Sequence, residues 1–181
     1  MNKKENKDRL FIISSFMDYT LLNENYPKSV YNFCKKNDIQ EKTFYKDFGS
    51  LDAIKKMIWQ SFYENAMSLL EKDKNFDVSS PKEKLLSFYF TFFEVLLLNR
   101  SYVLFVLSKE KILSKMSNLK TLRILFKGFA TELIEEGNIN KASYLQHSPN
   151  IFSEAAWLQL CFLLKFWVED TSESFEKTDQ A

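Results

Sequence analysis

The sequence predicts an all-α fold, in which a three-helix headpiece is followed by a larger helical bundle, about eight to nine helices in all. Three observations predict it. Apolar side chains recur three and four residues apart, which is the period of an amphipathic helix. The 181 residues include only 3 Gly and 3 Pro, so helix breakers are scarce. Hydrophobic residues make up 45% of the chain, which is enough for a substantial core.

The first predicted helix, at about residues 7–23, carries an apolar stripe at helical spacing. We expect it to end at Asn23 or Asn25, because asparagine tolerates the left-handed backbone conformation that closes many helices. The stripe consists of Leu10, Ile13, Phe16 and Met17.

Residues 29–50 have the spacing of a helix-turn-helix, with short helices predicted at about 28–36 and 40–47. The inward-facing positions are Val30, Phe33, Cys34, Ile39 in the turn, Phe44 and Phe48. The outer face of the second helix carries side chains that can form hydrogen bonds in a DNA groove, namely Glu41, Lys42, Thr43, Tyr45, Lys46 and Asp47. Any solvated helix shows such a face, so the pattern alone leaves DNA reading and a plain helical hairpin as equal alternatives.

Helix caps predict the second part of the chain. Ser50 caps a connecting helix that extends to about residue 72, with Asp52 in its first turn. After a polar linker at 72–79, Ser80-Pro81-Lys82-Glu83 combines an N-cap serine, a proline at the first helical position and a capping-box glutamate. Further helices are expected at 81–99, 102–108, 118–136 with Gly137 as C-cap, and 149–170, with a polar stretch at 109–117. The chain accordingly divides into a helix-turn-helix domain at residues 1–50 and a helical domain at residues 51–181.

Charge is distributed slightly unevenly between these parts. Residues 1–60 hold 11 Lys or Arg and 8 Asp or Glu, a net charge of +3, and residues 61–181 hold 14 and 16, a net charge of −2. The sign suits DNA binding by the first part. The excess is small, so groove fit and dimerisation would have to supply much of the affinity.

Other functional classes find little support. The lone histidine, His147, lies in a predicted loop, and no glycine-rich phosphate loop, Cys-x-x-Cys or His-Glu-x-x-His occurs, so we expect no enzyme, cofactor or metal site. Cys34 and Cys161 are expected to be buried thiols. No cleavable signal is apparent, and the apolar segments 88–98 and 155–168 are interrupted by polar side chains, which predicts a cytoplasmic protein without a membrane span.

The run Thr43-Phe44-Tyr45-Lys46-Asp47-Phe48-Gly49-Ser50 resembles the Thr-Leu-Tyr-x-x-Phe-x-Ser signature that closes the DNA-binding headpiece of TetR-type (tetracycline-repressor-like) transcriptional regulators. Ser29-Val30 and Phe33-Cys34 occupy the Thr-Val and Ile-Ala positions of that family. The resemblance covers about residues 7–60, and the rest of the chain agrees in being helical and of about the right length. It implies a bacterial, ligand-responsive regulator, most often a repressor, that binds a palindromic operator in double-stranded DNA as a homodimer.

Carried over by position, the resemblance implies that Ser29 and Tyr45 contact phosphates and that Lys42 and Thr43 face bases. Lys46 would add a phosphate contact or a second base contact, and Glu41 lies on the same face. Four positions depart from the family pattern: Asp38 replaces a turn glycine, Lys42 a small residue, Asp47 a histidine or tyrosine, and Leu51 a lysine, although Lys55 and Lys56 follow one turn later. Asp47 and Leu51 motivate an alternative, a helical ligand-carrying or protein-interaction module whose degenerate headpiece no longer binds DNA.

The last long predicted helix is apolar around nearly its whole circumference and must be buried on more than one side. In proteins of the resembled family the last helices of two subunits pack together, so we expect a homodimer; the alternative is a central helix in a monomeric bundle. The predicted interface residues are Trp157, Leu160, Cys161, Leu164 and Trp167. Residues 172–181, with Phe175 as anchor, have the pattern of the first turns of a further helix, so the chain is expected to be trimmed there.

The second part carries 13 of the 18 Phe residues, counted beyond residue 60, and a cavity among them would suit a small hydrophobic effector. The alternative is that these rings are core, which is the commoner role of an aromatic stripe. The predicted lining residues are Phe88, Phe92, Tyr102, Phe105, Phe126 and Phe129.

Overall fold

The computed structural model describes residues 3–109, 112–139, 141–173 and 176–179, and every regular element in this part of the chain is a helix. The predicted all-α fold class is confirmed. Helix α7 replaces the polar stretch predicted at 109–117. The helices are α1 (Lys3–Leu22), α2 (Val30–Lys36), α3 (Glu41–Asp47), α4 (Leu51–Leu70), α5 (Pro81–Leu97), α6 (Arg100–Lys109), α7 (Ile112–Asn118), α8 (Lys120–Asn138), α9 (Pro149–Glu169) and α10 (Glu176–Asp179), with a 3-10 turn at Ser143–Leu145.

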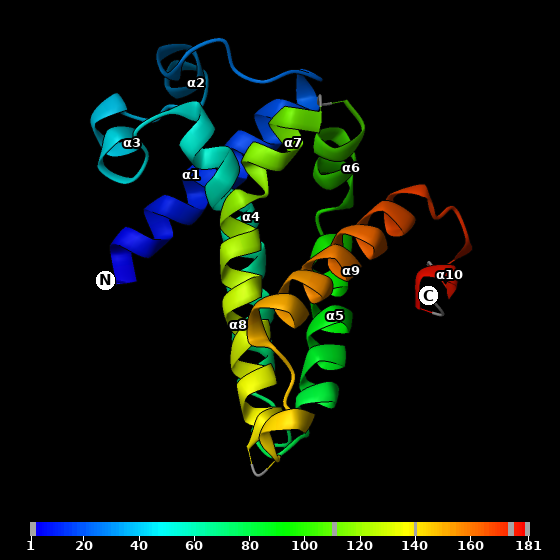
Figure 1. Cartoon of the computed structure of the whole chain (residues 1–181). Helices are drawn as coiled ribbons and strands as arrows, with labels where there is room; N and C mark the ends of the chain where they lie inside the picture. The colour runs from blue at the N-terminus through cyan, green and yellow to red at the C-terminus, as the bar shows by residue number, and fades with distance from the viewer. Residues whose placement is uncertain (1–2, 110–111, 140, 174–175, 180–181) are drawn as a thin grey trace. The chain divides into compact units, whose positions relative to one another are not determined.

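The chain forms two compact units. The N-terminal unit comprises residues 1–59 and 99–120, and the C-terminal unit comprises residues 60–98 and 121–181, so α4 begins in one and ends in the other. The division predicted at residue 50 differs from this grouping, because α6 packs beside α1 within the N-terminal unit (Figure 1). A contact between segments this far apart in sequence leaves no local pattern from which it could be predicted.

Four phenylalanine rings connect α1, α2 and α3 at the centre of the headpiece. The ring of Phe33 on α2 lies 5.7 Å from that of Phe16 on α1 and 6.0 Å from that of Phe44 on α3, and Phe44 lies 5.6 Å from Phe48. All four side chains are almost completely buried. Aromatic pairs in such arrangements contribute about 0.5–1.5 kcal/mol each beyond their burial. The inward positions predicted for Phe33, Phe44 and Phe48 are therefore those that hold the three helices together.

Helix α1 ends near the predicted position, but a different residue takes the left-handed conformation. That residue is Glu24, with φ of 47°, and neither Asn23 nor Asn25. The N–H of Asn25 donates to the carbonyl of Thr20 at 3.2 Å, and that of Glu24 donates to Leu21 at 3.3 Å, which are the two hydrogen bonds of a Schellman cap. The cap requires a positive φ one residue beyond the last half-helical residue, so the length of the helix decides which side chain takes it.

Phe88 on α5 lies at the centre of the C-terminal unit. Its ring centroid is 5.3 Å from those of Phe126 and Phe129 on α8, 5.4 Å from that of Phe92 and 5.6 Å from that of Tyr63 on α4. Phe88, Phe92 and Phe126 have no exposed surface. Burial, with smaller contributions from nearby carboxylates, raises the pKa of Tyr63 to about 12. These rings are core residues that fill the space between the helices.

The capping box predicted for α5 is confirmed. The N–H of Glu83 donates to Ser80 Oγ at 3.4 Å, and the N–H of Ser80 donates to the Glu83 carboxylate at 2.8 Å, with Pro81 at the start of the helix. Hydrogen bonds from Ser80 hold the pKa of Glu83 below its usual value. The C-cap predicted at Gly137 is wrong: α8 continues through it to Asn138, and its φ is not positive. A Cβ on Gly137 would lie 3.7 Å from the Pro81 ring, so this glycine lies where α8 closely approaches the start of α5.

Ion pairs join α8 to its neighbours in the C-terminal unit. The Glu154 carboxylate on α9 lies 2.7 Å from Arg123 Nη2 and 2.5 Å from Lys127 Nζ, both on α8. Hydrogen bonds from Arg123 and Lys127 lower the pKa of Glu154 to about 2. On α5, Lys84 Nζ lies 2.9 Å from the Glu136 carboxylate of α8. These contacts connect α8 to both α5 and α9 at the edge of the core.

The segment after α9 folds back on Asp170. Its carboxylate oxygens accept hydrogen bonds from the N–H and hydroxyl of Ser172, at 2.8 and 2.6 Å, and from those of Thr178, at 3.0 and 2.6 Å. These hydrogen bonds hold the pKa of Asp170 well below its usual value. Only the short α10 is described beyond this point, and Phe175, the predicted anchor of a further helix, lies outside the described residues.

The two cysteines are free thiols on different helices. Cys34 on α2 is buried, as predicted, whereas Cys161 on α9 is only half-buried. Burial raises the pKa of both thiols, that of Cys161 to about 11. Both are therefore protonated and weakly nucleophilic at neutral pH.

Candidate nucleic-acid interface

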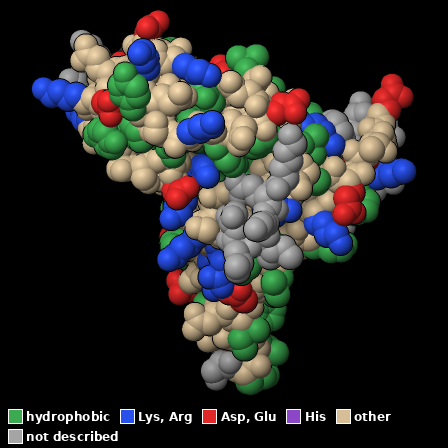
Figure 2. Space-filling model, turned by 90° about the horizontal axis from the view of Figure 1, so that it is seen from above, with side chains coloured by type: hydrophobic (Ala, Val, Ile, Leu, Met, Phe, Trp, Pro, Cys, Tyr) green, Lys and Arg blue, Asp and Glu red, His purple; other side chains and the backbone are tan. Residues whose placement is uncertain are grey.

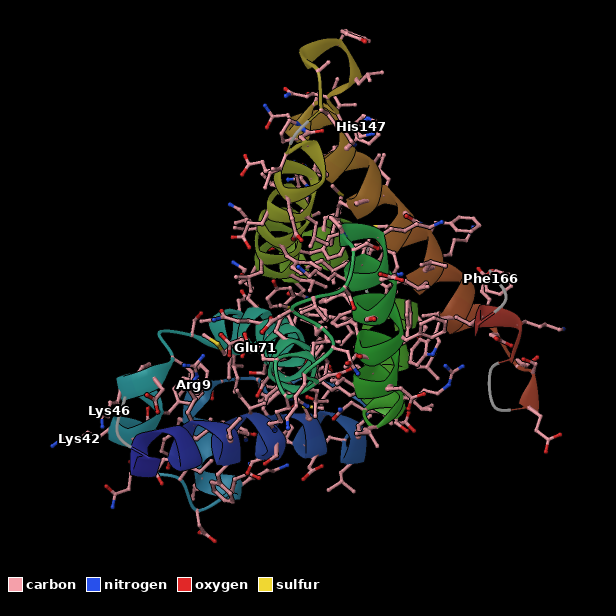
Figure 3. The ribbon with its side chains drawn as sticks, turned by 90° about the horizontal axis from the view of Figure 1, so that it is seen from below. Arg9, Lys42, Lys46, Glu71, His147 and Phe166 are labelled. Carbon is pink, nitrogen blue, oxygen red and sulfur yellow. The ribbon has the colours of Figure 1, made fainter. Side chains whose placement is uncertain are left out.

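Helix α3 turns one face into the headpiece core and the other to solvent. Phe44 has no exposed surface, whereas Tyr45 keeps 53% of its surface exposed. Lys42 and Lys46, four residues apart, share the outer face, and Figure 3 shows both side chains projecting outward from the helix. Of the residues predicted to face DNA, the structure exposes Glu41, Lys42, Tyr45 and Lys46 and half-buries Thr43.

The turn before α3 is closed by Asp38, which has a φ of 52°. The N–H of Ile39 reaches back to the carbonyl of Cys34 at 2.9 Å and so ends α2. Glycine takes this left-handed conformation most easily, and aspartate is one of the few other residues that visit it routinely. The substitution of the family glycine by Asp38 therefore keeps the geometry of the turn.

Helix α2 is positioned through its first turn. The Oγ of Ser29 accepts a hydrogen bond from the N–H of Asn32 at 3.1 Å, and the Asn32 side-chain oxygen accepts one from the Tyr19 hydroxyl of α1 at 2.9 Å. Lys36 Nζ lies 5.0 Å from the Tyr19 ring centroid. Ser29, predicted to contact a phosphate, thus acts as the N-cap of α2, and its hydroxyl hydrogen is still available to donate to an anion.

A hollow of about 460 Å³, which we call the notch, lies where α2, the end of α3 and the start of α4 meet. It brings together Ser29 and Tyr45, the two residues predicted to contact phosphate. Figure 2 shows Lys and Arg side chains scattered over the molecular face seen from above, with a few acidic side chains among them. The notch is lined by Tyr26, Pro27, Ser29, Val30, Tyr45, Gly49, Ser50, Leu51, Asp52 and Lys55.

The start of α4 supplies the positive potential of the notch. Ser50 Oγ accepts a hydrogen bond from the N–H of Ala53 at 3.1 Å, and other N–H groups of this first turn have no intrahelical partner. Lys55 Nζ lies 3.9 Å from the Tyr26 ring centroid and 3.2 Å from the Asp52 carboxylate. Lys55 therefore places a cation in the notch, where the resembled family has a lysine at the position of Leu51. The Asp52 carboxylate offsets part of the Lys55 charge.

Tyr26 links the notch to α6 within the N-terminal unit. Its ring centroid lies 5.4 Å from that of Phe105 on α6, edge-on, and 6.0 Å from that of Phe16 on α1. The same ring therefore touches Lys55 at the start of α4 and Phe105 on α6. A displacement of α6 would reach the notch through this one aromatic side chain.

The six residues predicted to line an effector cavity belong to the cores of the two units. Tyr102 and Phe105 lie on α6 in the N-terminal unit, whereas the other four, Phe88, Phe92, Phe126 and Phe129, lie in the C-terminal unit. Phe105 is half-buried and the other five are buried in the cores. Their spacing reflects core packing, which is the alternative that the sequence left open.

A largely apolar hollow in the C-terminal unit lies between α5, α8 and α9, with a volume of about 390 Å³. We call it the distal hollow. The small residues Gly137, Ala155 and Ala156 leave this space, and small residues on helices expected to pack together were the sequence signal that could have indicated it. The lining consists of Pro81, Lys82, Leu85, Ala130, Leu133, Ile134, Gly137, Lys141, His147, Phe152, Ala155, Ala156 and Gln159.

Helix α9 packs the face predicted for a dimer interface against its own chain and exposes a different face. Ile151, Leu158 and Phe162 are 68%, 61% and 62% exposed and lie on one face of the helix. Phe152, at the start of the helix, is 44% exposed. The predicted interface is therefore corrected: Cys161 is half-buried, and the core of the same chain takes Trp157, Leu160, Leu164 and Trp167.

Helix α9 is the most apolar long helix in the described part of the chain. By length and composition α9 could cross a membrane, although the core helix of a soluble protein passes the same test. Of its most apolar window, 39% is buried inside the chain. The remainder leaves an apolar surface on one side of α9.

Comparisons with known proteins agree with this architecture. The crystal structure of a protein from Syntrophomonas wolfei str. Goettingen, assigned to the TetR family of transcriptional regulators, matches this chain with a TM-score of 0.71. The match covers 97% of this chain and 90% of the other at 18% sequence identity, so it shows a shared fold. No curated protein matches the sequence. The family profile described as "Tetracyclin repressor-like, C-terminal domain" matches residues 84–181, which is more than half of the chain and lies outside the segment that carries the headpiece signature. The chain therefore belongs to the tetracyclin repressor-like family.

Proposed function

We propose that this protein is a ligand-responsive transcriptional regulator that binds a palindromic operator in double-stranded DNA as a homodimer and represses transcription. The observation that carries the proposal is α3, whose outer face presents Lys42 and Lys46 beside the notch. A lysine at a groove-facing position can bind O6 and N7 of guanine, which gives sequence discrimination. Thr43, half-buried next to Lys42, would reach only the nearest base edge.

Phosphates would be bound in the notch. The hydroxyls of Ser29 and Tyr45 and the ammonium of Lys55 all line it, and the first turn of α4 adds N–H groups. Such contacts set the register of a protein on the duplex, and the base contacts then specify the sequence. The paired state of Lys55 predicts modest affinity with a small salt dependence.

Dimerisation would use the exposed face of α9. Ile151, Leu158 and Phe162 form an apolar surface that water solvates poorly, and a twofold-symmetric pair of such faces would cover itself. Two headpieces related by this symmetry match the two half-sites of a palindrome. Repression would follow because a dimer on its operator excludes other proteins from the same DNA.

The response to a ligand would act on α6. Phe105 on α6 touches Tyr26, and Tyr26 lies against Lys55 of the notch. A ligand that favours a shifted position of α6 would displace Lys55 and so favour a dimer with weaker phosphate contacts. The ligand needs a difference in affinity between the two states, since equal affinity shifts nothing.

Fluorescence anisotropy with DNA flanking the gene, compared with a random duplex of equal length, tests the proposal. Lys42→Ala should lower affinity for the flanking DNA about five- to one-hundredfold with little effect on the random duplex. Tyr45→Phe should weaken both, because it removes a phosphate contact. Lys72→Ala, an exposed lysine just after α4, is the matched control and should change neither. Equal weak binding of both duplexes by the unmodified protein would contradict the proposal.

The alternative function is a helical ligand-carrying or protein-interaction module whose headpiece no longer binds DNA. The observations that favour it are Leu51 at the start of α4 and the Asp52 carboxylate 3.2 Å from Lys55. Equal weak binding in the experiment above, with a folded headpiece, would be the result that it predicts.

A further inference from the structure

The distal hollow has a cationic end. Lys82 comes from the first turn of α5 and Lys141 from the segment after α8. These two segments are adjacent, because Lys84 Nζ lies 2.9 Å from Glu136 and a Cβ on Gly137 would lie 3.7 Å from the Pro81 ring. The two lysines therefore line the hollow from adjacent segments at one end of α5 and α8.

Among the residues that the structure describes, no carboxylate lines the distal hollow. The acidic side chains on the neighbouring turns are engaged elsewhere: Glu83 accepts hydrogen bonds from Ser80, and Glu136 pairs with Lys84. Glu135 lines a separate hollow on the other side of His147. Neither Lys82 nor Lys141 forms an ion pair with a residue in the described part of the chain. The charge at this end of the distal hollow is therefore positive and locally unbalanced.

The walls of the distal hollow are apolar and held in place. Asn138 fixes the His147 loop with two hydrogen bonds, 2.7 Å to its carbonyl and 2.8 Å from its N–H, and the His147 ring lies 4.5 Å from Phe152. Figure 3 shows His147 near the start of α9. The polar group on the α9 side, Gln159, has its side-chain oxygen hydrogen-bonded to the Tyr89 hydroxyl at 3.3 Å. A volume of about 390 Å³ is within the range of small-molecule sites.

We infer that the distal hollow binds an amphiphilic monoanion, with an aliphatic or aromatic body along Leu85, Leu133 and Ala155 and a carboxylate between Lys82 and Lys141. Burial of the body supplies most of the affinity, and the two ammonium groups select the charge of the head. The statement that this ligand is the effector rests on the proposed function. The statement that the distal hollow binds an amphiphilic monoanion does not depend on it.

Calorimetric titration of the full chain with decanoate, decanol and decylamine tests the inference, since the three probes share one chain and differ in the head. Decanoate should bind at least fivefold more tightly than decanol, and decylamine should bind most weakly. Lys82→Gln combined with Lys141→Gln should reduce decanoate to the affinity of decanol, because each exposed charge contact contributes about two- to fivefold. Lys74→Gln, in the loop between α4 and α5, is the matched control and should leave all three affinities unchanged.

Ala155→Phe tests whether decanoate occupies the distal hollow. Because Ala155 shares the exposed face of α9 with Leu158, Leu158→Ala, which lies outside the hollow, is made alongside it and should leave decanoate binding unchanged. Ala155 is exposed, so a larger side chain is tolerated by the fold, and the new ring should fill the hollow and abolish decanoate binding. Equal affinity for the three probes, no binding of any, or decanoate binding that survives Ala155→Phe would each overturn the inference. DNA binding is measured separately. Selective decanoate binding without specific DNA binding would refute the proposed function and support the binding site. Specific DNA binding without selective decanoate binding would refute the binding site alone.

Discussion

Replacing Asp52 by Asn should tighten DNA binding while it weakens the fold. The Asp52 carboxylate lies 3.2 Å from Lys55 Nζ, and its side chain is 77% exposed. A phosphate oxygen bonded to Lys55 at about 2.8 Å would place its charge roughly 6 Å from that carboxylate. Two like charges at this separation repel by about 0.7 kcal/mol in a water-like dielectric, so Asp52→Asn should raise the affinity of each headpiece about threefold.

The same substitution should lower stability. A carboxylate in the first turn of a helix is stabilised by the helix dipole, so its loss from α4 should cost about 0.3–1 kcal/mol of unfolding free energy. A substitution that only damaged the fold would lower both stability and DNA affinity, so a rise in affinity together with a loss of stability would point to the removed charge. Asp77→Asn, in the loop before α5, removes one negative charge far along the chain from the notch and should change neither quantity by this amount.

The assay does not require the operator, because the phosphate contribution is independent of sequence. Anisotropy titrations of a random 24-bp duplex, roughly two helical turns, would be run at about 50 mM and 300 mM salt for Asp52→Asn, Asp77→Asn and the unmodified chain. The gain should shrink at the higher salt, where the screening length falls below the distance involved. An affinity at low salt that is unchanged or reduced in Asp52→Asn would refute the assignment of Lys55 as a phosphate ligand.

Three further predictions concern stability, each read from the midpoint of urea unfolding. Asp38→Ala should lower the free energy of unfolding by about 1–2 kcal/mol, since alanine is strained at a φ of 52°. Asp38→Gly should change it by less than about 0.5 kcal/mol. Equal losses in the two variants would show that backbone strain is not the cause. Gly128→Ala should raise the free energy of unfolding by about 0.5–1 kcal/mol, because alanine favours the helix and a Cβ at this position in α8 meets no atom within 4 Å. A decrease would show that the added methyl group meets a neighbour. Glu154→Gln should lower the midpoint at pH 7, and because folding depresses the pKa of Glu154 to about 2, the difference should narrow as the pH falls from about 4.5 toward 2. A difference that does not depend on pH would contradict the ion-pair origin.

The headpiece was largely predictable because its signals are local. Phe33, Phe44 and Phe48 are inward at spacings that any helix would align, and the turn between them is short. The capping box at Ser80 and Glu83 needs only four consecutive residues, and it is present as predicted. The close approach at Gly137 was mistaken for a helix end, because a glycine near the end of an apolar pattern serves either purpose.

Local features of the candidate site were also predictable, and contacts between distant segments were not. The sequence predicted which side chains of α3 face outward, since burial of Phe44 leaves Lys42 and Lys46 on the opposite side. It did not predict that Asp52 would pair with Lys55, or that Tyr26 would join Lys55 to α6, because rotamers and contacts between distant segments decide both.

The all-α class, most helix positions and the face that α3 presents could be predicted from the amino-acid sequence, since each depends on residues within a few turns of one another. Which residues of α9 are core and which are surface depends instead on how the helix packs in the folded chain. A helix that is apolar all round has no polar face to orient it, so the partners packed against it choose the side that is buried. The same packing placed Phe88 and Phe126 in the core and left the distal hollow beside Ala155 and Gly137.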